Sequence, residues 1–408
     1  MNQPLSPIPT RSLPAGGDSL SLLGFGCMRF PRKAGRIDQP AVDALLARAI
    51  QLGVNYFDTA WMYPGSEEAV GLFLSRPGAG GRPLREQVYL ATKLAYMAVK
   101  DRPGMERMLQ TSLERLCTDH IDYYLVHSLT SWADWEKLKE LGIREFLREH
   151  RQSGRLRRLG FSWHGNLGDF QRVVDDFEWE FCQIQLNYLD EHFQAGIQGM
   201  RYAAGRGLGV MVMEPLRGGT LAGKLPTALQ EALSRHPAAD GAGRTPAYWG
   251  LRWVMDHPEV QVVLSGMNEL SQLEENAATA AESLPHSLRP EDLALLEQVK
   301  QSYKARIKAP CTGCSYCMPC PHGVDIPGCF SAWNSRAMLG GWKDTMKYLM
   351  FTGGSHPSRA SQCVGCGLCQ TRCPQQIPIP ARLAEASREL ERPWLTLPVG
   401  VALKVLGR

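Results

Sequence analysis

The chain has 408 residues, of which 44% are hydrophobic and 21% are charged, the ordinary balance of a globular protein. This balance excludes a chain that is disordered or collagen-like throughout, and the net charge of +4 is too small to indicate binding to nucleic acid. No apolar run reaches the roughly 20 residues of a membrane-spanning helix, so no membrane span is expected.

Residues 1–19 are rich in proline, glycine and serine, and we interpret them as a leader or a short hairpin. After them, apolar runs typical of buried parallel strands alternate with stretches of helical periodicity. One such stretch predicts a helix over 41–53 that stops at Gly53. The predicted strands span 21–28, 54–59, 88–94, 121–127, 157–163, 181–188, 209–215 and 260–266.

This alternation predicts an α/β fold of the (β/α)8 or TIM-barrel class. Such a barrel needs eight strand–helix units and usually takes about 250 residues, close to the length available here. The alternative is an open doubly wound sheet, which the strand count and the absence of an early G-x-G-x-x-G turn disfavour. A last helix and a linker over 288–310 place the end of the barrel near residue 305, so we expect the barrel to occupy 20–305.

The segment from residue 311 to residue 373 is unusually rich in cysteine. Nine of the twelve fall between Cys311 and Cys373. The N-terminus has no basic start followed by an apolar core, so we expect no secretory signal and a cytoplasmic location. Dense cysteines in such a chain indicate metal or redox chemistry rather than a disulfide framework. We therefore expect a second domain over 306–390, largely helical, and a short apolar tail over 391–408.

Polar side chains stand where three neighbouring predicted strands of the barrel end. Asp58 ends the second strand and Tyr63 lies in the loop beyond it, while Lys93 ends the third strand and His127 the fourth. Because catalytic groups of such barrels gather at the carboxyl ends of the strands, these four side chains are expected to converge at one mouth.

These four residue types suit proton-coupled hydride transfer to a carbonyl. A carbonyl that accepts a hydride needs a proton for its oxygen, and a phenol with a pKa near 10 gives up its proton with difficulty at neutral pH. The ammonium of Lys93 favours the phenolate of Tyr63, and Asp58 holds Lys93 charged and oriented. His127 can orient the carbonyl or share the proton.

The segments D-T-A-W-M-Y, A-T-K-L and L-V-H-S, in this order, resemble the aldo-keto reductase superfamily over roughly residues 20–285. The resemblance implies that Asp58, Tyr63, Lys93 and His127 are the family's catalytic tetrad, with Tyr63 as the general acid. It also implies a nicotinamide cofactor across the same mouth. The residues expected to bind it are Gly26, Met28, Ser162, Gln183, Met213, Pro215, Leu216, Ser265, Gly266, Glu275 and Asn276.

The chain departs from the family pattern at three places. Trp163 replaces the asparagine that usually follows the serine at the end of strand five, and Met213 stands where an aromatic usually stacks on the nicotinamide. Gly266, Met267 and Gln272 occupy the stretch where NADP-preferring members carry basic residues, and none of them is charged. A phosphate without a basic partner is poorly held, so the sequence does not favour NADP over NAD.

The cysteine-rich segment holds two runs of four cysteines. The second has the C-x2-C-x2-C-x3-C-P spacing of bacterial ferredoxins, and the first has one residue fewer before its fourth cysteine. Eight such thiolates predict two [4Fe–4S] clusters, and structural zinc is the weaker alternative because its cysteine pairs usually stand further apart. The runs consist of Cys311, Cys314, Cys317 and Cys320, and of Cys363, Cys366, Cys369 and Cys373.

In two-cluster ferredoxins the fourth cysteine of each run ligates the other cluster. That resemblance implies that Cys373 joins the first three cysteines of the first run, and that Cys320 joins those of the second. The shortened first run leaves the alternative that each run holds its own cluster. Cys329 remains as a spare, and its default interpretation is a small buried residue.

The whole chain resembles the iron–sulfur-containing branch of the aldo-keto reductases. We predict an oxidoreductase that acts on a carbonyl or alcohol substrate with NAD(P)H and uses its clusters for electron transfer to a redox partner protein. Two alternatives stay open: an electron-transfer protein whose barrel uses no nicotinamide, and a barrel enzyme with purely structural clusters. The 128–153 region, with Trp132 and Trp135, is expected to shape the substrate pocket.

Overall fold

The computed structural model describes a chain of two compact units. The described residues are 7–14, 16–78, 81–223, 227–238, 243–311, 313, 317–340, 342–353, 357–373, 375–394 and 396. The first unit comprises Met1–Gly223 and Gln230–Leu293, and the second comprises Lys224–Leu229 and Ala294–Arg408. The division falls inside helix α12 (Pro290–Lys304), earlier in the chain than the expected boundary near residue 305.

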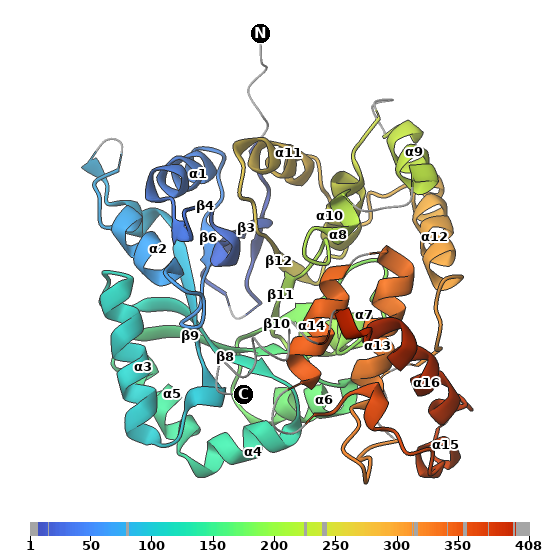
Figure 1. Ribbon diagram of the computed structural model, residues 1–408. Coiled ribbons are helices and arrows are strands. Elements are labelled where there is room, and N and C mark those ends of the chain that lie inside the picture. The colour runs from blue at the N-terminus through green and yellow to red at the C-terminus, as the bar shows by residue number, and fades with distance from the viewer. Residues whose placement is uncertain are drawn as a thin grey trace. The chain divides into compact units, whose positions relative to one another are not determined.

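The first unit is built on a closed barrel of eight parallel strands (Figure 1). The ring closes between its first and last strands, where Leu23 pairs with Val263. This confirms the predicted TIM barrel and rules out the open sheet. In spatial order the strands are β10 (Phe181–Gln185), β11 (Gly209–Met213), β12 (Val260–Ser265), β3 (Leu23–Gly26), β6 (Tyr56–Asp58), β7 (Tyr89–Leu94), β8 (Ile121–Leu129) and β9 (Leu156–Trp163).

Each barrel strand coincides with a predicted run, but β3, β10 and β11 end two or three residues before the run does. Strand β10 ends before Asn187, whose side-chain oxygen accepts the N–H groups of Leu189 and Asp190, both at 3.1 Å, and so turns the chain. Strand β11 ends before Glu214, whose φ of +57° lies in the left-handed region. These turns lift the segments after β10 and β11 out of the sheet and into loops at the mouth.

Helices lie around the strands, as Figure 1 shows, and several of them begin where the sequence offers a polar cap. Asp38, Asp101 and Asn166 each accept a backbone N–H of the first turn of their helix. The helices are α1 (Gln39–Gln51), α2 (Ser66–Leu74), α3 (Arg102–Arg115), α4 (Trp132–Glu140), α5 (Ile143–Gln152), α6 (Leu167–Asp176), α7 (Gly196–Gly205), α8 (Thr220–Gly223), α9 (Thr227–Arg235), α10 (Pro246–Met255) and α11 (Leu270–Ala281).

The N-terminal segment forms the hairpin that was one of its two interpretations. Strands β1 (Thr10–Ser12) and β2 (Ser19–Ser21) pair antiparallel. Leu13 and Leu20 are buried in the same apolar cluster as the barrel interior. Gly209 makes room for them, because a Cβ there would lie 2.3 Å from Leu13 Cδ1. The hairpin therefore covers the end of the barrel where the strands begin.

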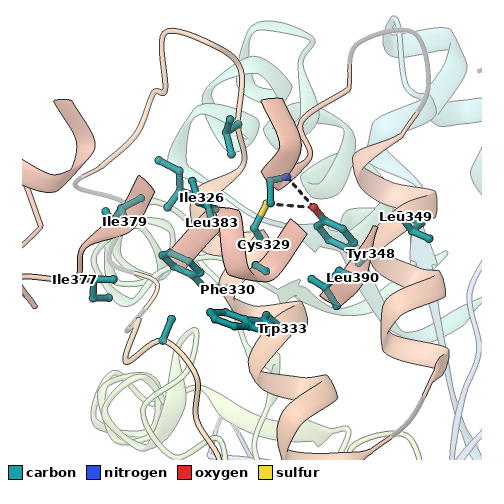
Figure 2. Packing of buried hydrophobic residues seen from close by; sticks show 14 residues of the cluster. Ile326, Cys329, Phe330, Trp333, Tyr348, Leu349, Ile377, Ile379, Leu383 and Leu390 are labelled. Atoms are coloured by element: carbon teal, nitrogen blue, oxygen red, sulfur yellow. Dashed lines mark hydrogen bonds between the residues drawn. The ribbon is translucent and has the colours of Figure 1, made fainter. Parts of the chain in front are cut away.

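The second unit is largely helical, as predicted. Its helices are α13 (Ile326–Leu339), α14 (Trp342–Thr352), the short α15 (Leu368–Thr371) and α16 (Ile379–Leu390). Figure 2 shows Phe330, Trp333 and Leu383 packed together between α13 and α16 in one apolar cluster. Burial of this cluster gives the unit a core of its own, against which Cys311, Cys317, Cys320, Cys363, Cys369 and Cys373 pack.

Some predictions fall on residues outside the described ranges. These are Cys314, the first six residues of the leader and most of the 391–408 tail. None of the described helices is long and apolar enough to cross a membrane.

Candidate functional site

The centre of the barrel mouth is a buried ion pair. Asp58 at the end of β6 and Lys93 in β7 are only 4% and 1% exposed. Lys93 Nζ lies 2.6 Å from Asp58 Oδ1 and also donates to the carbonyl of Thr59 at 2.7 Å. With two strong acceptors the ammonium is held charged in one place, and one of its hydrogens remains for a third partner.

Tyr63 and His127 stand beside this pair. The loop after β6 turns back at Tyr63, whose N–H donates to Ala60 O at 2.9 Å. The Tyr63 ring centre lies 5.4 Å from Lys93 Nζ and 5.8 Å from the His127 ring centre, with the two rings nearly perpendicular. The structure thus brings together all four strand-end residues that the sequence singles out.

Burial and charge set the protonation of this group. Burial acts to lower the pKa of Lys93, but the Asp58 carboxylate outweighs it and raises that pKa above its usual value, so Lys93 stays protonated. Burial raises the pKa of the Tyr63 phenol, and the Lys93 cation opposes that rise. At neutral pH the Tyr63 phenol is therefore protonated, and the Lys93 cation stabilises the phenolate that forms when the proton is lost.

His127 is neutral. Burial, the Lys93 cation and His164 lower the pKa of His127 to about 3. Its Nδ1 atom is buried and has no hydrogen-bond partner among the described residues. A neutral imidazole with a free nitrogen in an 8% exposed side chain can donate or accept one hydrogen bond to a bound molecule.

This neutrality predicts a specific acid sensitivity. Below pH 6.5 an unfolded His127 takes up a proton that the folded imidazole does not take up until about pH 3, so the free energy of unfolding falls as pH falls through this window. Between pH 7 and pH 5 the loss amounts to about 2 kcal/mol. His127→Gln should remove that loss, as measured by urea unfolding under argon at both pH values. The exposed His192→Gln serves as control, and an unchanged pH dependence in His127→Gln would contradict the prediction.

Buried hydroxyl and carboxylate groups of residues next to Asp58 and Lys93 link the two strand ends to helix α2. Thr59 and Ser66 share a hydrogen bond of 2.8 Å, and Ser66 also donates to the carbonyl of Cys27 at 2.9 Å. Thr92, next to Lys93, donates to the buried Glu67 at 2.6 Å. These contacts fix α2 and the Tyr63 loop to the strand ends. Sequence reasoning missed them, because Glu67 and Glu68 together look like the ordinary acidic first turn of a helix.

Two of the predicted nicotinamide-site residues lie in the same mouth. Gln183 on β10 is 2% exposed, and its Nε2 lies 3.5 Å from Asp58 Oδ2. Its Oε1 is buried without a hydrogen-bond partner among the described residues. Ser162 Oγ accepts the N–H of Ser128 at 2.6 Å and retains its own hydroxyl proton. Gln183 and Ser162, on neighbouring strands, therefore offer one acceptor and one donor, the two groups with which a primary amide can pair.

The residue after Ser162 has a different role from its family counterpart. Trp163 is fully buried, stacks near Phe161 and Phe170, and donates its indole N–H to Asn166 O at 3.2 Å. Its partners are thus all protein atoms of the core. Trp163 therefore packs under helix α6 and its indole N–H is used by Asn166 O.

The loops after β11 and β12 carry the other predicted cofactor residues. Ser265 and Asn276 are joined by a 3.1 Å hydrogen bond, and Glu275 accepts the hydroxyl of Thr245. Pro215 is buried and Leu216 lies against Gly250 of α10. Met213 is half-buried against the barrel core, Gly26 is half-buried at the end of β3, and Met28 is 60% exposed.

Arg29 is a mouth residue that sequence reasoning missed. It follows Met28, and its guanidinium lies 3.9 Å from the carboxylate of Glu214. A Cβ added to Gly218 would meet this guanidinium at 2.9 Å, and one added to Gly266 would lie 3.5 Å from Arg29 Cδ. A cation thus spans two loops that are far apart in sequence. From the sequence, the uncharged Gly266, Met267 and Gln272 give no sign of a cation at this place.

The two tryptophans expected to shape the pocket are engaged elsewhere. Trp135 of α4 is fully buried and packs against Trp179, and its indole donates to Asp176 at 2.6 Å. Trp132 lies between the cations of Lys139 and Arg172, at 4.4 and 4.2 Å from its ring centre. The helical spacing of residues 132–140 aims these rings at α6 and its neighbours, so the expectation that they line the pocket is not supported by their contacts.

In the second unit, the thiols of the two cysteine runs approach one another. Burial raises the pKa of the Cys369 thiol, and the nearby thiols of Cys363, Cys320 and Cys366 raise it further. Cys320 belongs to the first run and the other three to the second. Cys320 of the first run therefore lies close enough to the second run to interact with Cys369 electrostatically.

The local backbone suits sulfur ligation of a cluster. Gly313, Gly365 and Gly367 have φ values of +73°, +76° and +76°, so the chain can curl and present amide N–H groups inward. The cysteines in the described ranges form no disulfides. No three His, Cys, Asp or Glu side chains in the described ranges form a group that could hold a metal ion, and Cys314 lies outside those ranges.

Comparison with known proteins agrees with this architecture. The Aldo/keto reductase family model matches residues 22–300, and the 4Fe-4S dicluster domain model matches residues 310–377. L-galactose dehydrogenase of Arabidopsis thaliana is 25% identical over 317 residues, which cover 74% of this chain and 97% of the relative.

Two solved structures share the fold. An aldo-keto reductase from Bacillus halodurans in its holo form is 23% identical with a TM-score of 0.58, covering 72% of this chain and 96% of its own. One from Klebsiella pneumoniae in complex with NADPH is 23% identical with a TM-score of 0.54, covering 69% and 92%. The family model spans most of this chain, and the barrel, the mouth and the cysteine runs agree with it: the chain belongs to the aldo/keto reductase family and carries a 4Fe-4S dicluster domain after its barrel.

Proposed function

We propose that this oxidoreductase interconverts a small carbonyl compound and its alcohol with NAD(P)H, with Tyr63 as the general acid. The observation that carries the proposal is the buried Lys93–Asp58 ion pair beside Tyr63 and the neutral His127. Burying a lysine with a single counter-ion costs desolvation free energy, and such buried charges are often found at functional sites. Its place beside a phenol therefore points to proton transfer.

The chain's own residues perform the proton half of the reaction. When bound, the nicotinamide supplies a hydride to the carbonyl carbon. The Tyr63 hydroxyl donates its proton to the carbonyl oxygen, which becomes the alcohol hydroxyl. Lys93 stabilises the phenolate that remains, and Asp58 keeps Lys93 protonated. His127, neutral throughout, donates a hydrogen bond to the same oxygen and aims the carbonyl; in the alcohol-to-carbonyl direction each proton transfer reverses.

The mouth fits a nicotinamide cofactor. The unpaired Oε1 of Gln183 would accept an N–H of the carboxamide, and the Ser162 hydroxyl would donate to its oxygen. Arg29 would face the anionic diphosphate beside Gly218 and Gly266. Residues 266–276 include no basic side chain that could pair with a 2′-phosphate, so NAD and NADP should both be tested.

Gln183 gives a direct test of cofactor use. Gln183→Leu should weaken the binding of the preferred nicotinamide about tenfold, because a neutral hydrogen bond is worth about 1 kcal/mol or somewhat more. The measurement is a fluorescence or calorimetric titration of the anaerobic protein with NADH and NADPH. Gln110→Leu, on the exposed side of α3, is the matched control. Equal affinity in both variants would remove Gln183 from the site.

For the second unit we propose two [4Fe–4S] clusters with exchanged fourth ligands. One would be held by Cys311, Cys314, Cys317 and Cys373, and the other by Cys363, Cys366, Cys369 and Cys320. The mixed thiol group around Cys369 supports the second set. When bound, the clusters move single electrons. Free thiols in such number fit the reducing cytoplasm.

A second candidate is an electron-transfer protein whose barrel uses no nicotinamide and serves as a docking or redox-substrate domain. Trp163 in the core and Met213 against the barrel interior favour it, since both replace family contacts to the nicotinamide. One experiment separates the two candidates: anaerobic purification with an absorption spectrum, iron and sulfide counts, and a nicotinamide titration on the same sample. Micromolar nicotinamide binding supports the oxidoreductase, and its absence with full clusters supports the second candidate.

A further inference from the structure

The two cysteine runs begin in the same way, although their sequences there differ. In each, an alanine just before the first cysteine is almost fully buried: Ala309 is 0% and Ala360 1% exposed. The carbonyl of each alanine accepts the N–H of the first cysteine, Cys311 at 2.8 Å and Cys363 at 3.1 Å. The position of each alanine peptide therefore fixes where its run starts.

A buried polar side chain from a helix holds each alanine. In the first run it is Asn334 of α13, which is 8% exposed. Asn334 Oδ1 accepts the N–H groups of Lys308 and Ala309 at 2.9 and 3.0 Å, and its Nδ2 donates to Ala309 O at 2.6 Å. These three hydrogen bonds to one side-chain amide fix the position of residues 308–309 relative to α13.

In the second run the holding residue is Tyr348 of α14, which is 4% exposed. Its hydroxyl accepts the N–H of Ala360 at 2.8 Å and donates to Glu391 at 2.6 Å, just beyond α16. Glu391 also accepts the N–H of Ser361 at 3.2 Å. Figure 2 shows Tyr348 beside Cys329, whose sulfur lies 3.6 Å from the same hydroxyl. Both lone pairs and the proton of this phenol are thereby engaged.

We propose that Asn334 and Tyr348 are separate positioning residues, each of which sets the properties of one iron–sulfur cluster by anchoring the alanine before its first cysteine. Ligand geometry and amide hydrogen bonds are what a protein uses to tune such a cluster. Because the two anchors share no partner in the described residues, their effects should be independent. The inference rests on the proposed ligand sets.

The test is an EPR-monitored redox titration of the full-length protein, purified under argon. Asn334→Leu should shift the midpoint potential of one cluster, and Tyr348→Phe that of the other. Each should release iron from that cluster to a chelator about tenfold faster, the factor expected from one or two lost buried hydrogen bonds. The signal lost in Cys363→Ser identifies the cluster of the second run.

Matched variants keep the test decisive. Thr352→Val removes a hydroxyl from the same helix as Tyr348, but one that bonds only to the helix's own carbonyl, and should leave both potentials unchanged. Asn334→Asp keeps the two-fold acceptor but sets a carboxylate oxygen against the Ala309 carbonyl in place of the Nδ2 donor, so the potential should lie between those of Asn334→Leu and the unaltered protein. Should Tyr348→Phe fail to fold, Glu391→Leu removes the acceptor of Ser361 and should shift the same signal.

Three results would overturn the proposal: potentials unchanged in both anchor variants, both clusters moving together in each, or Thr352→Val behaving like Tyr348→Phe. A failure of the proposed ligands looks different. In that case the unaltered protein lacks iron, or Cys363→Ser retains both signals.

Discussion

Replacing Tyr63 with phenylalanine is expected to lower kcat for carbonyl reduction by about 100- to 10,000-fold, the usual contribution of a positioned general acid. The substitution keeps the ring that faces His127 and Lys93 and removes only the hydroxyl, so the nicotinamide affinity should change little. Steady-state reduction of a panel of aldehydes with NADH and NADPH, together with a cofactor titration, measures the two quantities separately.

A second tyrosine near the mouth, Tyr96, provides a matched control for Tyr63→Phe. Tyr96 follows the next strand, in the turn Tyr96–Ala98, and its hydroxyl interacts with Thr130 and Asp134, which together with burial hold its pKa at about 12. Tyr96→Phe should retain turnover within a few-fold. Should Tyr63→Phe keep the activity of the unaltered enzyme, Tyr63 is not the acid and the proposed proton path is wrong.

Replacing Cys320 with serine is expected to remove one whole cluster, so the iron content falls from about eight to about four atoms per chain. With exchanged ligands, the lost EPR signal is the one that also disappears in Cys363→Ser. If each run holds its own cluster, it is instead the one that disappears in Cys311→Ser. Iron analysis and EPR of the dithionite-reduced proteins measure the result.

Cys117 supplies the control for this series. It is an exposed, unpaired thiol after α3 in the barrel unit, so Cys117→Ser should retain both signals and all the iron. Full iron content in Cys320→Ser would exclude Cys320 as a ligand under either arrangement.

The barrel and the centre of its mouth could be predicted because they follow from short-range rules. Buried parallel strands form continuous apolar runs, and their carboxyl ends meet at one edge. Asp58, Lys93 and His127 stand at three adjacent ends, so their convergence follows once the barrel is recognised. Strand ends were less predictable, because Asn187 and Glu214 turn the chain through a side-chain hydrogen bond and a left-handed backbone.

What could not be predicted depends on side-chain direction and on residues distant in sequence. Trp132 and Trp135 were expected to shape the pocket, but Trp135 is buried in the core and Trp132 lies between the cations of Lys139 and Arg172. Arg29 reaches Gly218 and Gly266 only because the barrel brings three loops to one rim. Asn334 and Tyr348 lie on helices between the two cysteine runs, 25 and 12 positions from the alanines that they hold. No local sequence pattern marks either of them as an anchor.

The pairing of the first barrel strand with the last has a consequence for how the protein is made. Arg11 donates to the carbonyls of Met255, His257 and Val260, the last of them 249 positions further along the chain. During synthesis, the barrel therefore cannot close until β12 has emerged from the ribosome. The cysteine runs emerge only after β12. All eight barrel strands are thus available for folding before the cysteines of the proposed clusters leave the ribosome.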